Sequence, residues 1–574
     1  MRKRILTISL MALAACATGP SVVTPIAPLA RAPGDSTVDA LLALNALCSA
    51  EASGLGAAKP DLKLAGGMGT GGFKVDTASA DAQAWFNYGL ALSHAFYHQD
   101  AKAAMKRSVQ NDPSCSLCAW GEAWVLGPTL NYGINEDERK AALAAATRAQ
   151  SLVKPGDDKA RRLAEAIVAR YADVGAAVSD EKNAVGRPKA GEGQTEPAFG
   201  QAMAKIAADY TGEAELAVLA AHSLLIPVRG DDERGLKPAL ALLEGVLKAH
   251  PDDTGAIHYY IHGAEFDDRA EDALAYADRL GRLAPAASHL VHMPAHTFFH
   301  AGRYEDAAVV NAKAIEADTK WLVAGGDPRP PADASFRLPM YYAHNLSFGL
   351  AGALMSGDGE LALRYADHAT KAYPASAPAQ RSDPTPRTYV AFARYAPDRM
   401  LALAPSSRLD AQFGLYRAYG RGEALLQKGD ASGARRELAE LREVNSDRTE
   451  KKVAIAVLEG RLAMAEGNAR QAARVFADAA KMQETEFAGY MDPPQWWYPV
   501  RRSVAAAWLK AGDFAKAEAE ATASLKAWKH DPLALWVLGK AQLGLGRKGD
   551  GEASLAKAKS LWRGRFESIT VEAI

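Results

Sequence analysis

The sequence lacks several features that would point to a common class of function. Lysine and arginine total 67 and aspartate and glutamate 68 among 574 residues, so there is no basic excess of the kind that binds nucleic acid. Beyond the first residues, no stretch reaches the ~18 consecutive apolar residues that a membrane-spanning helix needs. The HExxH motif of zincin proteases, the P-loop, the dinucleotide-binding fingerprint and an evident Ser-His-Asp motif are also missing. These absences argue against a nucleic-acid-binding protein, a membrane-embedded body and several well-known catalytic sites.

The first residues predict export from the cytoplasm. Basic residues at positions 2–4 precede a short apolar run at 5–15, which is too short to span a bilayer and has the length of a signal-peptide core. The run ends in Leu-Ala-Ala-Cys16, which resembles a bacterial lipobox. The resemblance implies cleavage before Cys16, lipid attachment to that cysteine and, because Ala17 rather than aspartate follows, an outer-membrane lipoprotein. We expect the body to face the periplasm, but the sequence itself leaves the face of the outer membrane open. The alternative is an ordinary secretory signal with a chance cysteine. Residues 16–36 are rich in proline, threonine and alanine and are expected to form a flexible tether.

Cysteine is scarce. Apart from Cys16, the chain has Cys48, Cys115 and Cys118, and three thiols form at most one intrachain disulfide. Outside the cytoplasm, a local disulfide between Cys115 and Cys118, or a bridge from one of them to Cys48, is favoured over redox chemistry. The pair is a single CxxC motif, which excludes a zinc site built from two such motifs.

Strand signals are weak, whereas apolar residues recur with helical spacing almost throughout. Short Gly-Asp, Gly-Asn and Asp-Pro breaks separate the helical stretches. Counting back from Pro113 finds Trp85, Gly89 and Ala101, which are spaced as in the tetratricopeptide repeat (TPR). The same frame fits a second set of positions, namely Gly422, Gly429, Ala434, Gly460, Gly467, Ala472, Phe476, Ala479, Gly512, Ala517, Gly539 and Gly546. The resemblance covers residues 81–562 and implies an all-α, TPR-like helix-turn-helix superhelix (solenoid), in which small residues let paired helices pack closely.

Interruptions of the repeat pattern divide the chain into expected segments. These are a lipoprotein signal peptide (1–15), the tether (16–36), an N-terminal helical or TPR region (37–174), an exposed loop (175–197), a central TPR region with clustered histidines (198–319), a proline-rich insertion (320–342), a further TPR region (343–404) and a C-terminal TPR array (405–574). Long insertions such as 320–342 and the aromatic segment Asp492–Pro499 are often lids or binding loops, although many only connect repeats.

The candidate chemistry lies in two histidine pairs. His258 and His262, and likewise His292 and His296, are four residues apart, which places both imidazoles of a pair on one face of a helix. The pairs are offset by 34 residues, the period of a TPR unit, so neighbouring repeats are expected to present them side by side. Pro294 falls inside the second pair and is expected to kink its helix.

The TPR resemblance implies that these histidines line a concave groove, because the first helix of each repeat lines the groove in that family. His289 and His344 occupy equivalent positions in successive repeats. The histidines expected to face one cavity are His258, His262, His289, His292, His296, His300 and His344. Packed helix axes lie ~8–10 Å apart, so pairs on adjacent helices could meet at one ion. The candidate metal ligands are His258, His262, His289, His292, His296 and His344.

Imidazole ligands suit zinc, copper, iron or nickel, and the spacing does not choose among them. Glu265 lies on the same helix face as the first pair and is the candidate further ligand or general base. Without a metal, the histidines would instead bond to one another, stack on tyrosines such as Tyr259 and Tyr341, or bind a peptide. His94 and His98 either line the same groove farther along or lie at the surface or in a turn.

Several segments resemble a broad bacterial group of histidine-containing TPR proteins. They are Trp120-Gly121-Glu122 with Trp124, His-Tyr-Tyr-Ile-His, His-Leu-Val-His-Met-Pro-Ala-His, Tyr-Tyr-Ala-His-Asn and Asp-Pro-Pro-Gln-Trp-Trp-Tyr. This resemblance implies the fold and no particular activity. Two functions stay open: a binding scaffold whose groove holds a peptide, a partner protein or a small ligand, and a metal-dependent hydrolase or oxidoreductase with its site in the groove.

Overall fold

The structure is a computed structural model. It describes residues 62–130, 133–172, 195–228, 234–323, 340–372, 385–403, 411–487 and 495–574, all of which belong to one unit. Cys16, Cys48, the tether at 16–36 and most of the segments 175–197 and 320–342 lie outside the described residues.

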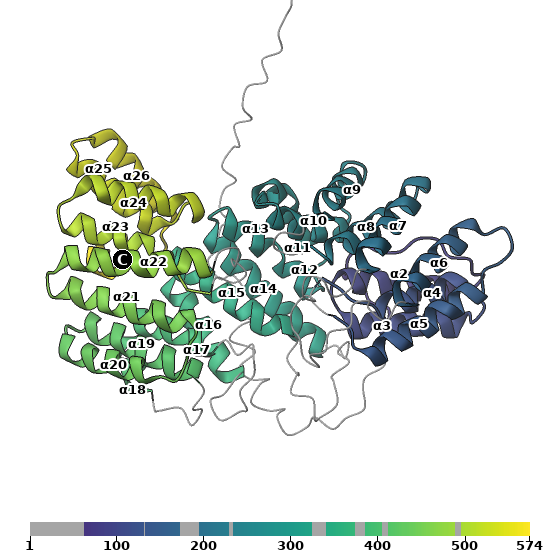
Figure 1. Cartoon of the computed structure of the whole chain (residues 1–574), viewed down its shortest axis with the longest axis horizontal. Coiled ribbons are helices and arrows are strands. Elements are labelled where there is room, and N and C mark those ends of the chain that lie inside the picture. Colours follow the sequence, from purple (N-terminus) through teal and green to yellow (C-terminus); the bar gives the residue numbers. More distant parts are fainter. Residues whose placement is uncertain are drawn as a thin grey trace, which may run out of the picture. The chain divides into compact units, whose positions relative to one another are not determined.

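The described residues form helices joined by short turns, with no β-strand among them (Figure 1). The helices are α2 (Ala80–His94), α3 (His98–Asn111), α4 (Ser116–Val125), α5 (Glu136–Ser151), α6 (Asp158–Ala172), α7 (Thr195–Asp209), α8 (Ala214–Leu225), α9 (Leu236–Ala249), α10 (Thr254–Phe266), η1 (Ala270–Ala273), α11 (Leu274–Leu283), α12 (Ser288–His292), α13 (Pro294–His300), α14 (Tyr304–Val323), α15 (Met340–Ser356), α16 (Gly359–Ala372), α17 (Thr385–Tyr395), α18 (Pro397–Ala402), α19 (Ala411–Gln427), α20 (Ala431–Glu443), α21 (Thr449–Ala465), α22 (Ala469–Glu486), α23 (Arg501–Lys510), α24 (Phe514–Ala527), α25 (Pro532–Gly544), α26 (Lys548–Leu561), η2 (Phe566–Ser568) and η3 (Val571–Ala573). Most helices pack against the next one along the chain, which confirms the predicted all-α, TPR-like solenoid. Within this part of the chain, no helix is both long and apolar enough to cross a membrane.

Glycines with positive φ join the two helices of each C-terminal pair, as the repeat frame predicts. They are Gly429 (φ 81°), Gly467 (82°), Gly512 (76°) and Gly546 (79°). Such a left-handed conformation ends a helix and costs glycine little, because it has no Cβ. In two of the turns an aspartate follows directly. Asp430 and Asp513 each accept a hydrogen bond from a backbone N–H of the following helix, which begins that helix at a fixed residue.

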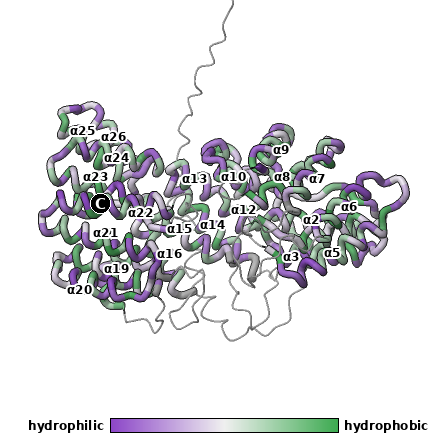
Figure 2. Tube along the Cα trace, viewed as in Figure 1, coloured by the Kyte–Doolittle hydropathy of each residue, from purple (hydrophilic) through white to green (hydrophobic). Residues whose placement is uncertain are grey.

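Small residues sit where neighbouring helices cross, both within a pair (α21 and α22) and between successive pairs (α19 and α21). A Cβ atom at Gly460 would lie 2.4 Å from Cε1 of Phe476, and one at Gly422 would lie 2.6 Å from Cδ2 of Leu458. Neither distance is compatible with a side chain, so these glycines permit the close packing that the TPR frame requires. Figure 2 shows apolar and polar residues mixed along individual helices, as expected when each helix buries one stripe against its neighbours and leaves the rest polar.

A close backbone approach between α14 and α15 gives a stability prediction. A Cβ at Gly352 would lie 2.6 Å from the carbonyl oxygen of Tyr304 and 2.9 Å from the backbone nitrogen of Ala308. Backbone atoms cannot move aside as a flexible side chain does, so Gly352→Ala is expected to destabilise the protein by about 1–3 kcal/mol. The midpoint of urea denaturation measures this change.

A second glycine provides the matched control. Gly245 lies inside α9 with nothing within 4 Å of an added Cβ. Because alanine is the better helix former, Gly245→Ala is expected to stabilise by about 0.5–1 kcal/mol. If both variants shift the midpoint in the same direction, the close approach at Gly352 does not control stability.

The aromatic segment near Asp492–Pro499 belongs to the core of the C-terminal array from Gln495 onward. Trp496 and Tyr498 are fully buried, and the ring of Trp496 lies 5.1 Å from that of Tyr419 on α19. The Gln483 side chain on α22 donates to the carbonyl of Tyr498. In the described part of the segment these side chains therefore fill space between helices.

Cys115 and Cys118 are joined by a disulfide at the start of α4. Sγ of Cys115 also lies 3.0 Å from the backbone nitrogen of Cys118, as a side chain at a helix N-cap does. The alternative bridge to Cys48 involves a residue outside the described part of the chain.

Candidate metal centre

Four helices bring the clustered histidines together. The side chain of Asp253 accepts a hydrogen bond from the N–H of Ala256 and so fixes the start of α10. Pro294 is the first residue of α13, and the chain divides there into two short helices, so the kink predicted for this proline is present. Helix α10 carries His258 and His262, α12 carries His289 and His292, α13 carries His296 and His300, and α15 carries His344.

The histidines form two groups of three. Group A is His258, His262 and His289, and group B is His292, His296 and His344; in each group the potential ligand nitrogens lie within 4.8 Å of one another. All six are buried except His344, which is partly exposed. Each i,i+4 pair is therefore joined by a third histidine from the following repeat, whereas the sequence suggested that the two pairs would share one ion. The third histidines, His289 and His344, are the two that the repeat frame predicts to be equivalent.

In group B the protonation of two rings is fixed by their neighbours. Nδ1 of His292 lies 2.7 Å from Oδ1 of Asn311, whose amide nitrogen donates to the carbonyl of Ala307. Asn311 therefore presents an acceptor, and His292 carries its proton on Nδ1. Nδ1 of His296 lies 3.0 Å from Oε2 of Glu265, and an ionised carboxylate only accepts. His296 thus also carries a proton on Nδ1.

This arrangement points two lone pairs at each other. The Nε2 atoms of His292 and His296 are 3.0 Å apart, and in the neutral rings neither has a proton to donate. Two acceptors at this distance repel unless a cation or a shared proton lies between them. A ring whose Nδ1–H is held by a carboxylate or amide oxygen while Nε2 points at its neighbours is the arrangement of a metal-binding histidine.

Group A has one fixed ring and one adaptable ring. Nδ1 of His258 lies 2.6 Å from the backbone carbonyl oxygen of His94, so its Nε2 carries the lone pair. That atom is 3.1 Å from Nε2 of His289. Nδ1 of His289 is buried without a hydrogen-bond partner among the described residues. His289 can therefore carry its proton on Nε2 and donate it to Nε2 of His258. Alternatively, it can carry the proton on Nδ1, and the lone pairs of both Nε2 atoms then face an ion.

Each group has its own phenylalanine, which packs against all three of its imidazole rings. The ring centroid of Phe96 lies 4.5, 6.2 and 4.8 Å from the three imidazoles of group A. That of Phe348 lies 5.4, 5.1 and 5.6 Å from those of group B. Phe96 has φ of 62°, a left-handed conformation that costs a residue with a Cβ about 1–2 kcal/mol. Both groups therefore have an apolar neighbour, and one of these is held in a strained backbone.

Burial and nearby charges set the protonation of two rings of group A and of Glu265. Burial lowers the pKa of His258 to about 3 and holds the pKa of His289 well below its ordinary value. Burial alone would raise the pKa of Glu265, but His296 and His300 opposite it hold that pKa well below its usual range. Near neutral pH, the rings of His258 and His289 are therefore uncharged and Glu265 is ionised.

The other predicted residues lie around the two groups. Glu265 is not a member of either group, because its carboxylate oxygens lie 3.0 Å from Nδ1 of His296 and 3.1 Å from Nε2 of His300. His94 is only 1% exposed, and its Nε2 lies 2.6 Å from Oε1 of Glu215. It is thus a buried neighbour of group A rather than a surface histidine, while His98 stacks on the ring that covers that group.

Three residues of the centre were missed from the sequence. Phe348 lies four residues after His344, so helical spacing could have placed it beside that ring. Phe96 lies within the segment that contains His94 and His98, but nothing marked it as a neighbour of residues more than 150 positions away. Asn311 carries no signal in the sequence at all.

Comparisons with known proteins give no family for this chain. No protein-family model and no curated protein matches the sequence. Among solved structures, the TPR domain of P58(IPK) is 15% identical over 82% of this chain and 99% of its own, with a TM-score of 0.22. A human IFIT1 dimer with m7Gppp-AAAA is 11% identical over 92% and 96%, with a TM-score of 0.29. The Cut9 complex with Hcn1 is 10% identical over 86% and 89%, with a TM-score of 0.26. These TM-scores are too low to support an argument about this chain. Its own helices and their packing show an all-α protein with TPR-like helix pairs.

Proposed function

We propose that the protein binds transition-metal ions, one in each histidine group, on a TPR-like scaffold. Six imidazoles supply nitrogen ligands that suit zinc, copper or iron. In each group the ligand atoms lie within 4.8 Å of one another. Nitrogens around one ion with ~2.0–2.1 Å bonds need side-chain movements of about an ångström or less from this spacing.

The observation that carries the proposal is the pair of facing lone pairs in group B. Asn311 and Glu265 fix both Nδ1 protons, which leaves His292 and His296 with Nε2 atoms 3.0 Å apart. A shared proton is the competing explanation, and Glu265 could balance its charge. The third ligand in each group favours the metal, because a shared proton needs two nitrogens and not three.

Metal content and thermal stability test the proposal. The full chain is purified without a histidine tag, stripped with a chelator, and loaded with zinc or copper. Two ions per chain are expected by elemental analysis. An ion present at about 100 times its dissociation constant stabilises the folded state by about 2.7 kcal/mol per site, so the melting temperature rises with metal concentration. Less than one ion per chain, with an unchanged melting temperature, would count against the proposal.

We propose in addition that Cys16 carries a lipid that anchors the protein to the outer membrane, facing the periplasm. The lipobox-like sequence at the end of the apolar run supports this location. Cys16→Ser is expected to move the protein from the membrane fraction to the soluble fraction of the cell envelope, because the variant loses the thiol to which the lipid is attached. A variant that still fractionates entirely with membranes would contradict the anchor.

A peptide or protein partner is the remaining proposal from the scaffold fold. Five of the six imidazoles are buried, which supports a separate surface for such a partner, since a peptide cannot reach buried rings. A pull-down from envelope extracts with full-length protein tests for it. Recovery of the same partner by the parent and by a metal-free group B variant would support separate surfaces, and recovery of none would count against a scaffold role.

A further inference from the structure

The two histidine groups have the same construction and lie against each other. In each, two histidines four residues apart are completed by one from the following repeat. Between the groups, the ring centroids of His262 and His296 are 5.6 Å apart, and those of His289 and His292 are 5.8 Å apart. Within group A, the rings of His262 and His289 are 6.4 Å apart. Rings of different groups are thus as close as rings of one group, so ions in the two groups would be near neighbours.

The donors around this double site are imidazoles. Among the described residues that form the two groups, none is a carboxylate. Glu265 contacts the Nδ1 side of His296, away from the Nε2 atom that faces His292. Hard ions such as magnesium, calcium and manganese prefer oxygen ligands, whereas copper binds nitrogen sites more tightly than the other divalent metals of its row. An all-histidine double site therefore favours copper.

Burial makes the charge of the ion important. All three histidines of group A are buried, and Phe96 packs against their rings. The electrostatic cost of placing an ion in a medium of low dielectric is large and grows with the square of its charge. A monovalent ion is therefore better tolerated there than a divalent one. Of the metals that suit imidazole, copper has a stable monovalent state.

We infer that the two groups hold a coupled pair of copper ions that binds dioxygen between them; this inference rests on the proposed function. Two-metal sites with ions about 3.5–4 Å apart place both metals on one small ligand. Each cuprous ion gives up one electron, and dioxygen takes both electrons and becomes a bridging peroxide. The step leaves two cupric ions, consumes no proton and needs no other reductant. The imidazoles remain bound throughout, and Phe96 and Phe348 remain packed against the rings of the two groups.

Electron paramagnetic resonance of the copper-loaded full chain tests the coupling. The tag-free protein is loaded anaerobically with cuprous ion, its copper content is determined, and dioxygen is then admitted. Two copper ions per chain are expected, with a new absorption band in the near-ultraviolet or visible region. Little cupric resonance is expected, because the spins of two bridged cupric ions cancel.

Variants that remove one ligand from each group sharpen the test. His262→Asn and His344→Asn are each expected to retain one copper ion that gives a full cupric signal after oxidation, and to lose the absorption band. His250→Gln is the matched control, since His250 is an exposed histidine outside both groups, and it should behave as the parent does. Circular dichroism checks that each variant is folded, and either variant alone suffices for the comparison.

The measured copper content and cupric signal distinguish a failure of the coupled pair from a failure of metal binding itself. Two copper ions per chain with the full signal of two independent cupric ions would overturn the coupled pair and leave metal binding intact. Tight binding of two zinc ions that copper does not displace would do the same. Less than one ion of any kind per chain would overturn the proposed function and the coupled pair together.

Discussion

The His292→Ala variant is expected to bind one metal ion per chain where the unmodified protein binds two. His292 provides one of the two Nε2 atoms that face each other across group B. Its removal leaves His296 and His344, which are too few protein ligands for a three-histidine site, while group A keeps all three of its histidines. Elemental analysis after chelation and reloading measures the loss. The metal-dependent stabilisation should fall to about half, since each saturated site contributes separately.

The control for this prediction removes a histidine elsewhere. His250→Gln changes an exposed residue and is expected to keep both ions and the full stabilisation. Retention of two ions by His292→Ala would show that group B is not built around this residue. Loss of both ions would show that the groups bind cooperatively, which a double-site geometry permits but independent sites do not.

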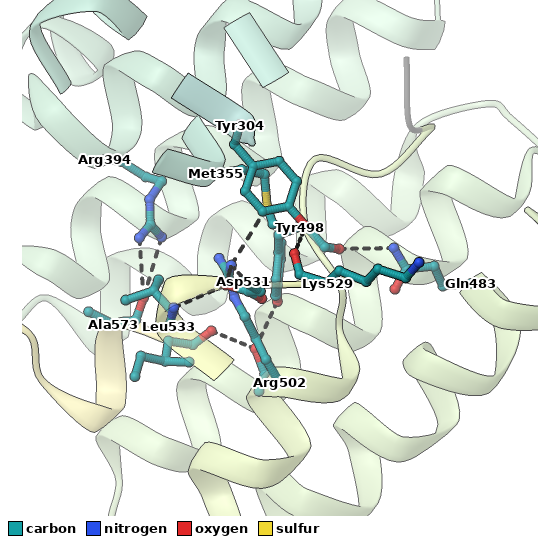
Figure 3. A network of polar contacts seen from close by, with 12 residues as sticks. Tyr304, Met355, Arg394, Gln483, Tyr498, Arg502, Lys529, Asp531, Leu533 and Ala573 are labelled. Atoms are coloured by element: carbon teal, nitrogen blue, oxygen red, sulfur yellow. Dashed lines mark hydrogen bonds and ion pairs between the residues drawn. The ribbon is translucent and has the colours of Figure 1, made fainter. Parts of the chain in front are cut away.

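Replacing Asp531 by asparagine is expected to lower the free energy of unfolding by about 3–5 kcal/mol. Arg502 and Asp531 form an ion pair (Figure 3). Nη1 of Arg502 lies 3.1 and 3.2 Å from the two carboxylate oxygens of Asp531, and both side chains are at most 1% exposed. Burial lowers the pKa of Arg502, and Asp531 counteracts this effect. Among the described residues, Nε and Nη2 of this arginine have no hydrogen-bond partner. Without the carboxylate, the positive charge would remain buried and uncompensated.

The choice of asparagine separates the charge from a second role of the residue. Oδ1 of Asp531 also accepts the backbone N–H of Leu533 and caps α25, and asparagine can keep this cap. The double variant Arg502→Met with Asp531→Asn is expected to recover most of the loss, because an apolar side chain replaces the unpaired charge. Glu567→Gln, which breaks the exposed pair with Lys559, should leave the urea midpoint unchanged. A stable Asp531→Asn single variant would mean that another group balances Arg502.

The fold was largely predictable because its signals are local. Glycines such as Gly429 and Gly467 mark the turns, and Gly460 with Phe476 marks a helix crossing. Each of these features is set within one repeat, so the sequence spacing and the structural spacing agree. Lateral stacking then repeats the same unit. The bounds of segments such as 175–197 depend on residues outside the described part of the chain and stay predictions.

The candidate centre was predictable only in part. The i,i+4 spacing determined that His258 and His262 share a face, because four residues make about one helical turn. The repeat period determined that His289 and His344 play equivalent parts. How the pairs are distributed between sites depends on how far each helix is displaced from the next. That displacement is set by packing across repeats, which the spacing does not contain.

What the sequence by itself determined is therefore the helical array, its repeat frame and the identity of the six histidines. What only the tertiary structure decided is their division into two groups and the proton position on the rings of His258, His292 and His296. The carbonyl of His94 orients His258 from 164 positions away, and Phe96 covers the same group from the turn between α2 and α3. Asn311 orients His292 from a neighbouring helix. Such contacts depend on where whole helices come to rest, and burial is what makes each of them energetically decisive, because a buried polar group without its partner costs about 1–3 kcal/mol.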